Sequence, residues 1–218
     1  ESEGALRELL GKSPALHDAR TLLGVSLLRQ KKPAEAAVVF RDGLIGNRRN
    51  PEAWKALEET ATALGKKVVR PSLPPRGGVL VQKNGDVQVG FADADKDGDF
   101  GWNYYASARA VFRYEGAYAA EFPGKEYRFT FREQLFAAAA AARWAEDERK
   151  DGGKVAEDLA RLAAEKKGKT LVPFVFFAMY PEPLPAEPEK EFALLRPRLE
   201  KYFDEKILVK SGEPVSAQ

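Results

Sequence analysis

The residues with the clearest potential for chemistry lie in the stretch DADKDGDF, Asp93 to Phe100. Its four aspartates stand at every second position beside a single glycine: Asp93, Asp95, Asp97 and Asp99. Carboxylates this close together repel one another unless a positive group neutralises them. One interpretation is a metal ion. The other is a solvated turn in which one aspartate caps a helix that begins near Trp102. Capping accounts for one or two of the carboxylates, so the pattern favours a metal.

The stretch resembles the first half of an EF-hand-like calcium loop, Asp-x-Asp-x-Asp-Gly, in which alternate side chains converge on one ion and the glycine permits a sharp turn. The resemblance implies calcium, which accepts about six to eight oxygen ligands, with the four aspartates at 93, 95, 97 and 99 as ligands. The second half departs from the pattern, because Tyr104 stands where the closing glutamate belongs. The predicted role is structural, fixing the corner between a hairpin and a helix.

Other residue types that usually carry catalysis are scarce. The sequence contains no cysteine, and its one histidine is His17. It also lacks a serine-nucleophile motif, a phosphate-binding loop and a dinucleotide fingerprint, so no catalytic or cofactor-binding residue is predicted. Carboxylate pairs alone can hydrolyse glycosides, which leaves a carboxylate- or metal-dependent hydrolase as an alternative. A glycan-binding module using Trp102, Tyr104 and Tyr105 is another, although aromatic residues at a helix start usually belong to the core.

The composition predicts a globular chain. Hydrophobic residues make up 44% and charged residues 31%, with a formal net charge of +2. This near balance argues against nucleic acid or an anionic lipid surface as a partner. The most apolar stretch, Leu171 to Tyr180, is too short to span a membrane and is interrupted by Pro173. We expect it to form a buried strand or core segment, whose front half pairs with a hairpin.

Helical periodicity dominates the first part of the chain. Apolar residues recur at helical spacing, and proline or polar clusters separate the runs, which predicts helices at about 15–30, 33–46 and 51–64. Two segments look alike: HDARTLLGVSLL begins at His17 and PEAWKALEETAT begins at Pro51, a separation of 34 residues. This spacing indicates an internal repeat.

The repeated segments resemble tetratricopeptide repeats, which have this period. Matching residues fill the positions at which such repeats pack their paired helices: Leu23, Gly24, Leu27, Ala36, Phe40, Trp54 and Leu57. Other positions depart from the family pattern: Arg20, Gly43, Arg48 and Glu58. The resemblance covers residues 1–65, with one full unit and a partial unit on each side. It implies a surface that binds a protein or peptide partner.

A second domain is expected after a linker. Residues 66–78 are rich in proline and glycine, which resists regular structure. Residues 79–218 are predicted to form an α+β domain that contains the acidic loop. Its expected elements are a hairpin at 79–91 with an Asn84-Gly85 turn, and helices at about 102–114, from 131 to beyond 144 with a Thr130–Glu133 capping box, 153–167, and 187–206 with Pro197 inside.

These observations predict a mainly α fold with a small β component, in which tetratricopeptide-like hairpins precede the α+β domain. The leading functional hypothesis is a non-enzymatic interaction or scaffold protein, bacterial in style, with a structural calcium-binding loop. Calcium favours a periplasmic or extracellular location, and the cytoplasm is the alternative.

Overall fold

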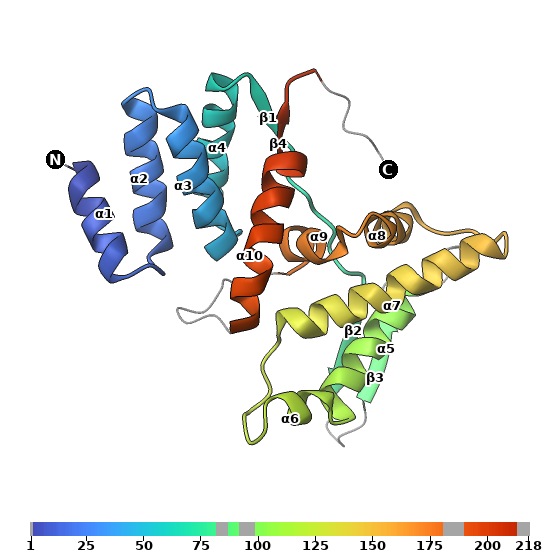
Figure 1. Ribbon diagram of the computed structural model, residues 1–218. Coiled ribbons are helices and arrows are strands. Elements are labelled where there is room, and N and C mark those ends of the chain that lie inside the picture. Colours follow the sequence, from blue (N-terminus) through green and yellow to red (C-terminus); the bar gives the residue numbers. More distant parts are fainter. Residues whose placement is uncertain (1, 82–86, 92–98, 181–189, 213–218) are drawn as a thin grey trace. The chain divides into compact units, whose positions relative to one another are not determined.

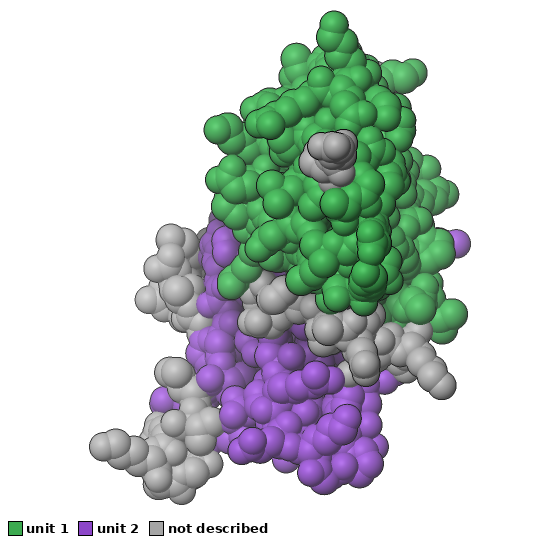
Figure 2. Space-filling view, turned by 90° about the vertical axis from the view of Figure 1, so that its left-hand side faces the viewer, with its two compact units in different colours: residues 1–71, 181–216 green, residues 72–180, 217–218 purple. Residues whose placement is uncertain are grey.

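A computed structural model of the protein describes residues 2–81, 87–91, 99–180 and 190–212 (Figure 1). This part of the chain is mainly helical with short antiparallel strands, which confirms the predicted fold class. The chain forms two compact units (Figure 2). Unit 1 consists of residues 1–71 and 181–216, and unit 2 is built from residues 72–180. The division after residue 71 falls inside the segment that the sequence predicts to be a linker.

Unit 1 begins with four helices, and the three predicted at 15–30, 33–46 and 51–64 are confirmed. Pro33 and Pro51 begin two of them. Proline suits this first position, because a backbone N–H there has no acceptor within the helix. The Asn50 side chain caps the last helix by accepting a hydrogen bond from the Ala53 N–H at 3.0 Å. The helices are α1 (Ser2–Lys12), α2 (His17–Arg29), α3 (Pro33–Gly46) and α4 (Pro51–Ala63).

These helices stand side by side in chain order (Figure 1). Helix α2 packs against α1 and α3, and α4 packs against α3. Large apolar side chains from α2, α3 and α4 are fully buried between them: Leu27, Phe40, Leu44 and Leu57. Unit 1 is therefore a stack of helical hairpins around one apolar core.

The C-terminal part of the chain returns to this stack. It comprises α10 (Lys190–Tyr202), a π-helical turn η1 (Phe203–Ile207) and strand β4 (Leu208–Lys210). Strand β4 pairs antiparallel with β1 (Lys66–Val68), with Lys66 opposite Lys210. The sequence predicts α10 as part of the second domain and residues 66–68 as part of a linker. The structure groups both with unit 1, because each is held by a partner far away in sequence.

Unit 2 combines a β-hairpin with five helices among its described residues. The predicted hairpin is confirmed, with Val79 opposite Val89, while its predicted Asn84-Gly85 turn lies outside the described residues. The elements are β2 (Gly77–Val81), β3 (Val87–Phe91), α5 (Gly101–Tyr114), α6 (Ala117–Glu121), α7 (Phe131–Lys150), α8 (Glu157–Lys167) and α9 (Leu171–Ala178). Helix α5 packs on both strands and on α7, which also contacts α8 and α9.

Small residues let the helices of unit 2 approach closely. Five alanines of α7 are buried: Ala137, Ala138, Ala141, Ala142 and Ala145. A Cβ atom added to Gly101 of α5 would lie 2.4 Å from the Trp144 ring of α7 and 2.9 Å from Leu159 of α8. Such contacts are shorter than van der Waals packing permits, so this glycine is required where the three helices meet.

The prediction of a strand or core segment in Leu171 to Tyr180 was half wrong. The segment is buried, but it forms helix α9 and does not pair with the hairpin. Pro173 lies in the first turn, where the helix has no acceptor for an N–H, so it does not interrupt α9. A fully apolar run has no periodicity that separates a strand from a helix buried on every side.

Candidate functional site

Helices α2 and α4 share an exposed face in unit 1. The two helices contact each other, and Asn50 connects them by donating from Nδ2 to Thr21 Oγ1 at 3.2 Å. Leu22 is the most exposed apolar residue of this face, with 61% of its surface exposed. Charged residues are also exposed on the two helices: Asp18, Arg29, Glu52, Lys55, Glu58 and Glu59. The two helices thus present an exposed apolar side chain together with exposed charges.

Two close contacts between α2 and α3 hold this face in place. A Cβ on Gly24 would lie 2.6 Å from the Phe40 ring, and a Cβ on Gly46 would lie 2.1 Å from His17 Cε1. At each glycine, the absence of a side chain therefore leaves room for an aromatic ring of the opposite helix. The sequence analysis predicted the packing role of Gly24 and Phe40. It did not identify the His17–Gly46 contact, whose members lie far apart in sequence.

The only histidine has a structural environment. His17 Nδ1 is buried and has no hydrogen-bond partner among the described residues. Burial lowers the pKa of His17, the positive charge of Arg20 lowers it further, and Asp18 opposes the shift. The imidazole is thus held in its neutral form against Gly46, which suits packing more than proton transfer.

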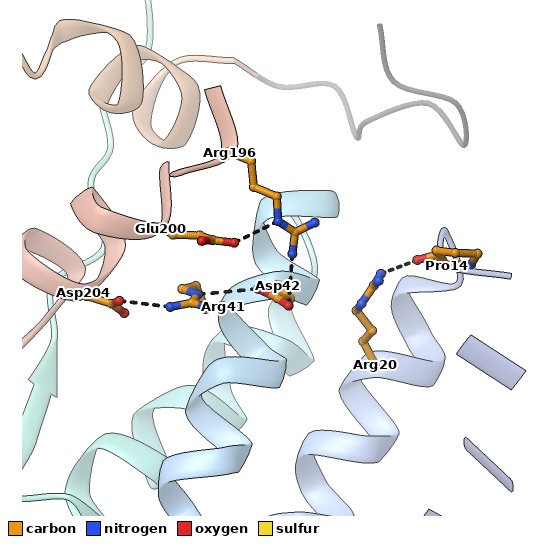
Figure 3. A network of polar contacts seen from close by, with 7 residues as sticks. All are labelled: Pro14, Arg20, Arg41, Asp42, Arg196, Glu200 and Asp204. Carbon is orange, nitrogen blue, oxygen red and sulfur yellow. Dashed lines mark hydrogen bonds and ion pairs between the residues drawn. The ribbon is translucent and has the colours of Figure 1, made fainter. Parts of the chain in front are cut away.

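Polar contacts connect α3 to the C-terminal helix (Figure 3). Arg196 of α10 pairs with Asp42 of α3 at 3.1 Å and with Glu200 at 2.8 Å. Arg41 of α3 pairs with Asp204 of η1 at 3.0 Å. Partly exposed pairs of this kind contribute about 0–1 kcal/mol each, so they fix the register of α10 more than they stabilise it.

Arg20 completes the network on the α2 side. Its Nη1 donates to the Pro14 carbonyl, as Figure 3 shows. Burial lowers the pKa of Arg20, Asp42 opposes the shift and Arg196 adds to it. The position that departs from the repeat pattern therefore holds a partly buried arginine that ties the start of α2 to the preceding turn.

Of the four aspartates of the acidic loop, Asp99 lies within the described residues. Asp93, Asp95 and Asp97 lie outside the described residues. Asp99 is buried, and its Oδ2 accepts from Arg76 Nη1 at 2.9 Å. Arg76 Nε also pairs with Asp158 Oδ2 at 3.2 Å, which connects the hairpin to the starts of α5 and α8. One predicted ligand thus already has a cationic neighbour, and the calcium site stays a prediction.

Aromatic residues beside the loop divide into two groups. Trp102 and Tyr105 are fully buried, which confirms the core interpretation for both, so neither offers a ring face to a sugar. Tyr104 is 48% exposed and stacks on Trp144 at 6.4 Å between ring centroids, while Phe100, also exposed, contacts both rings. Exposed Phe100 and Tyr104 therefore form a cluster with half-buried Trp144, and only Tyr104 belongs to the predicted set.

A polar network that the sequence analysis missed lies between α5 and α7. Glu133 is 1% exposed, and its two carboxylate oxygens accept from Arg109 Nε at 2.8 Å and from the Tyr127 hydroxyl at 2.7 Å. The Glu133 backbone N–H donates to Thr130 Oγ1 at 3.1 Å, as predicted for the capping box. The Glu133 side chain, however, accepts from Arg109 and Tyr127 and does not cap the helix. The capping-box pattern identified Glu133 but could not predict these two partners.

Burial and hydrogen bonding shift the pKa values of this network. Burial, supported by the hydrogen bond to Glu133, raises the pKa of Tyr127 to about 12. Burial also raises the pKa of Tyr105, whose hydroxyl donates to Gln134 Oε1 at 2.8 Å, to about 12. The pKa of Arg109 is raised, because its contacts with Glu133 outweigh its burial. Both tyrosines are therefore hydrogen-bond donors at neutral pH.

Within the described ranges, no group of three or more histidine, aspartate or glutamate side chains is arranged to hold a metal ion. None of the helices in these ranges is long and apolar enough to cross a membrane. No family model, curated protein or solved structure matches the chain. Functional inference consequently depends on the geometry of the two units.

Proposed function

We propose that the protein is a non-enzymatic interaction protein that binds a protein or peptide partner on the face shared by α2 and α4. The observation that carries this proposal is the exposure of Leu22 on two helices that also expose charged side chains. Protein interfaces commonly combine an apolar centre with a polar rim. The resemblance of the sequence to tetratricopeptide repeats supports the same interpretation, because stacked helical hairpins offer extended binding surfaces.

The packing beneath the face favours binding as well. The Gly24–Phe40 and Gly46–His17 contacts leave little freedom for α2 to shift against α3. A face that is already ordered loses less conformational entropy when a partner binds. The scaffold role therefore depends on rigid helices and needs no catalytic side chain.

A pair of matched substitutions tests this face. Leu22→Asp places a charge at the centre of the proposed face, while Val38→Asp places one on α3, where Val38 is 47% exposed. In an affinity capture from cells of the source organism, we expect partners of the unmodified chain to persist with Val38→Asp and to be lost with Leu22→Asp. Equal capture by both variants would contradict the proposal.

We also propose that the acidic loop binds calcium in a structural role. The support is the alternation of Asp93, Asp95, Asp97 and Asp99 around Gly98. Calcium should raise the melting temperature relative to chelator, since a ligand that binds only the folded state stabilises it. Asp95→Ala and Asp97→Ala should abolish the difference, whereas Asp147→Ala on the exposed face of α7 should preserve it. Identical melting curves in calcium and chelator would rule out the site.

A further inference from the structure

Arg113, in the last turn of α5, lies against two tyrosine rings. Its guanidinium carbon is 4.0 Å from the centroid of the Tyr127 ring and 4.8 Å from that of Tyr114. An arginine guanidinium can lie over an aromatic ring through cation–π attraction, which needs no hydrogen bond from its N–H groups. These contacts order the side chain and leave its N–H groups available as donors.

Those donors have no acceptor in the described part of the chain. The interactions of Arg113 there are the two ring contacts, and no carboxylate or carbonyl oxygen pairs with it. The planar fork of arginine matches the spacing of two oxygens on a carboxylate or phosphate, and the resulting bidentate contact is among the stronger hydrogen bonds in proteins. Arg113 thus offers ordered hydrogen-bond donors suited to an oxyanion, and no oxygen of the described chain accepts from them.

The network around Glu133 does not neutralise Arg113. Arg109 lies one helical turn before Arg113, and its charge is balanced by Glu133. Both oxygens of Glu133 are already engaged, by Arg109 and by Tyr127, so it has none to spare for Arg113. The same hydrogen bond fixes the Tyr127 ring on which Arg113 stacks. The network therefore positions the second arginine but does not neutralise it.

We propose that unit 2 binds an oxyanion, the carboxylate or phosphate group of a ligand, through the edge of the Arg113 guanidinium. Tyr127 and Tyr114 are positioning residues: they hold the fork, while Glu133 and Arg109 hold Tyr127. This site is independent of the partner face on α2 and α4, which belongs to unit 1. Either one can exist without the other.

The test follows arginine side chains directly in the full-length chain. With isotope-labelled arginine, the Nε–Hε signal of Arg113 is assigned by its loss from the NMR spectrum of Arg113→Lys or Arg113→Gln. The probes are inorganic phosphate and acetate, each compared with sodium chloride at equal ionic strength. We expect the Arg113 signal to shift and saturate with at least one probe and not with chloride.

An internal reference and two variants sharpen the result. Arg143 is 79% exposed and pairs only at 3.8 Å with Asp147, so its signal should follow ionic strength alone. Arg113→Lys keeps the charge but loses the fork. Followed through the backbone amide signals of its remaining labelled arginines, it should bind the probe at least about tenfold more weakly than the wild type. Tyr127→Phe keeps the ring but frees it from Glu133, and we expect a smaller loss.

Several outcomes would overturn the proposal. One is an Arg113 signal that tracks Arg143 in phosphate and acetate alike, which would leave Arg113 a stacking residue that favours the carboxyl end of α5. Another is an Arg113→Lys variant that binds as tightly as the wild type, because the fork would then be irrelevant. If Arg113→Lys does not fold, Arg113→Gln still assigns the signal, and the wild-type titration then decides the matter. Saturation by phosphate only, or by acetate only, identifies which oxyanion the site takes.

Discussion

Glu133 illustrates how one residue serves both a helix and a core. Its backbone receives the Thr130 cap that begins α7, and its side chain enters a buried network with Arg109 and Tyr127. A buried carboxylate is costly unless its oxygens are hydrogen-bonded. The network is thus stabilising only while both of its donors remain.

Removing one donor should therefore be costly. Tyr127→Phe leaves one oxygen of Glu133 buried without its partner, and we expect the free energy of unfolding to fall by about 1–3 kcal/mol. The matched control is Tyr104→Phe, because Tyr104 is exposed and its hydroxyl has no partner among the described residues. Urea unfolding of both variants provides the measurement. Equal stabilities would show that the Tyr127 hydroxyl contributes nothing.

His17 makes unit 1 sensitive to mild acid. Its pKa is lowered by burial in the folded chain, so the unfolded chain binds the proton more readily near the usual imidazole pKa of about 6.5. Stability is then fully present above this pH and is lost as the pH falls through it towards the lowered value.

Replacing the imidazole should remove this dependence. His17→Phe keeps a planar ring against Gly46 but cannot titrate. Denaturant midpoints measured across this pH range should fall with decreasing pH in the wild type and change less in His17→Phe. Parallel profiles for the two proteins would assign the acid sensitivity to other groups.

At the scale of elements, the contact between α2 and α3 depends on what glycine lacks. Alanine is favoured over glycine in a helix by about 1 kcal/mol. At Gly24, however, the added methyl group would meet the Phe40 ring, and overpacking costs about 1–3 kcal/mol. We expect Gly24→Ala to destabilise unit 1 despite the gain in helix propensity.

Gly11 provides the opposite case. It lies in α1, and a Cβ there would have no heavy atom within 4 Å. Gly11→Ala should therefore raise the thermal melting temperature slightly, whereas Gly24→Ala should lower it. Two shifts of the same sign in the same melting experiment would mean that helix propensity, and not packing, decides both.

The elements predicted correctly are those whose signals are local. Pro33, Pro51 and the Thr130 cap mark helix starts in the chain itself, and α3, α4 and α7 begin there. For the α9 region the sequence predicts only a buried strand or core segment, because its apolar run carries no period that would identify a helix. The Glu133 network and the Arg113 stacking were missed for another reason: their members meet only after α5 and α7 have packed.

At the scale of the whole molecule, unit 1 is assembled from two separate stretches of chain. Trp54 of α4 stacks on Phe203 of η1 at 6.5 Å between ring centroids, and Phe203 is fully buried. Burying such a side chain contributes about 1.5–3 kcal/mol, more than a partly exposed ion pair. The apolar contact therefore secures the C-terminal segment, and the charges around Asp42 align it.

Phe203→Ala tests this assembly. Loss of the ring and the cavity left behind should lower the free energy of unfolding of unit 1 by about 3–5 kcal/mol. Leu194→Ala, on α10 but 78% exposed, should leave it nearly unchanged. Because the tryptophans lie in both units, hydrogen exchange of the α4 backbone amides is the measurement that follows unit 1. A small effect of Phe203→Ala would indicate that α10 contributes little to the helical stack.

The pairing of β1 with β4 also sets an order of events during synthesis. Strand β1 leaves the ribosome long before β4, with all of unit 2 between them. Contacts of large sequence separation form late, because the intervening chain must first be closed into a loop. Until the C-terminal segment has been synthesised, Phe203 cannot cover Trp54, so the helical stack exposes this apolar surface while unit 2 already has its whole main segment.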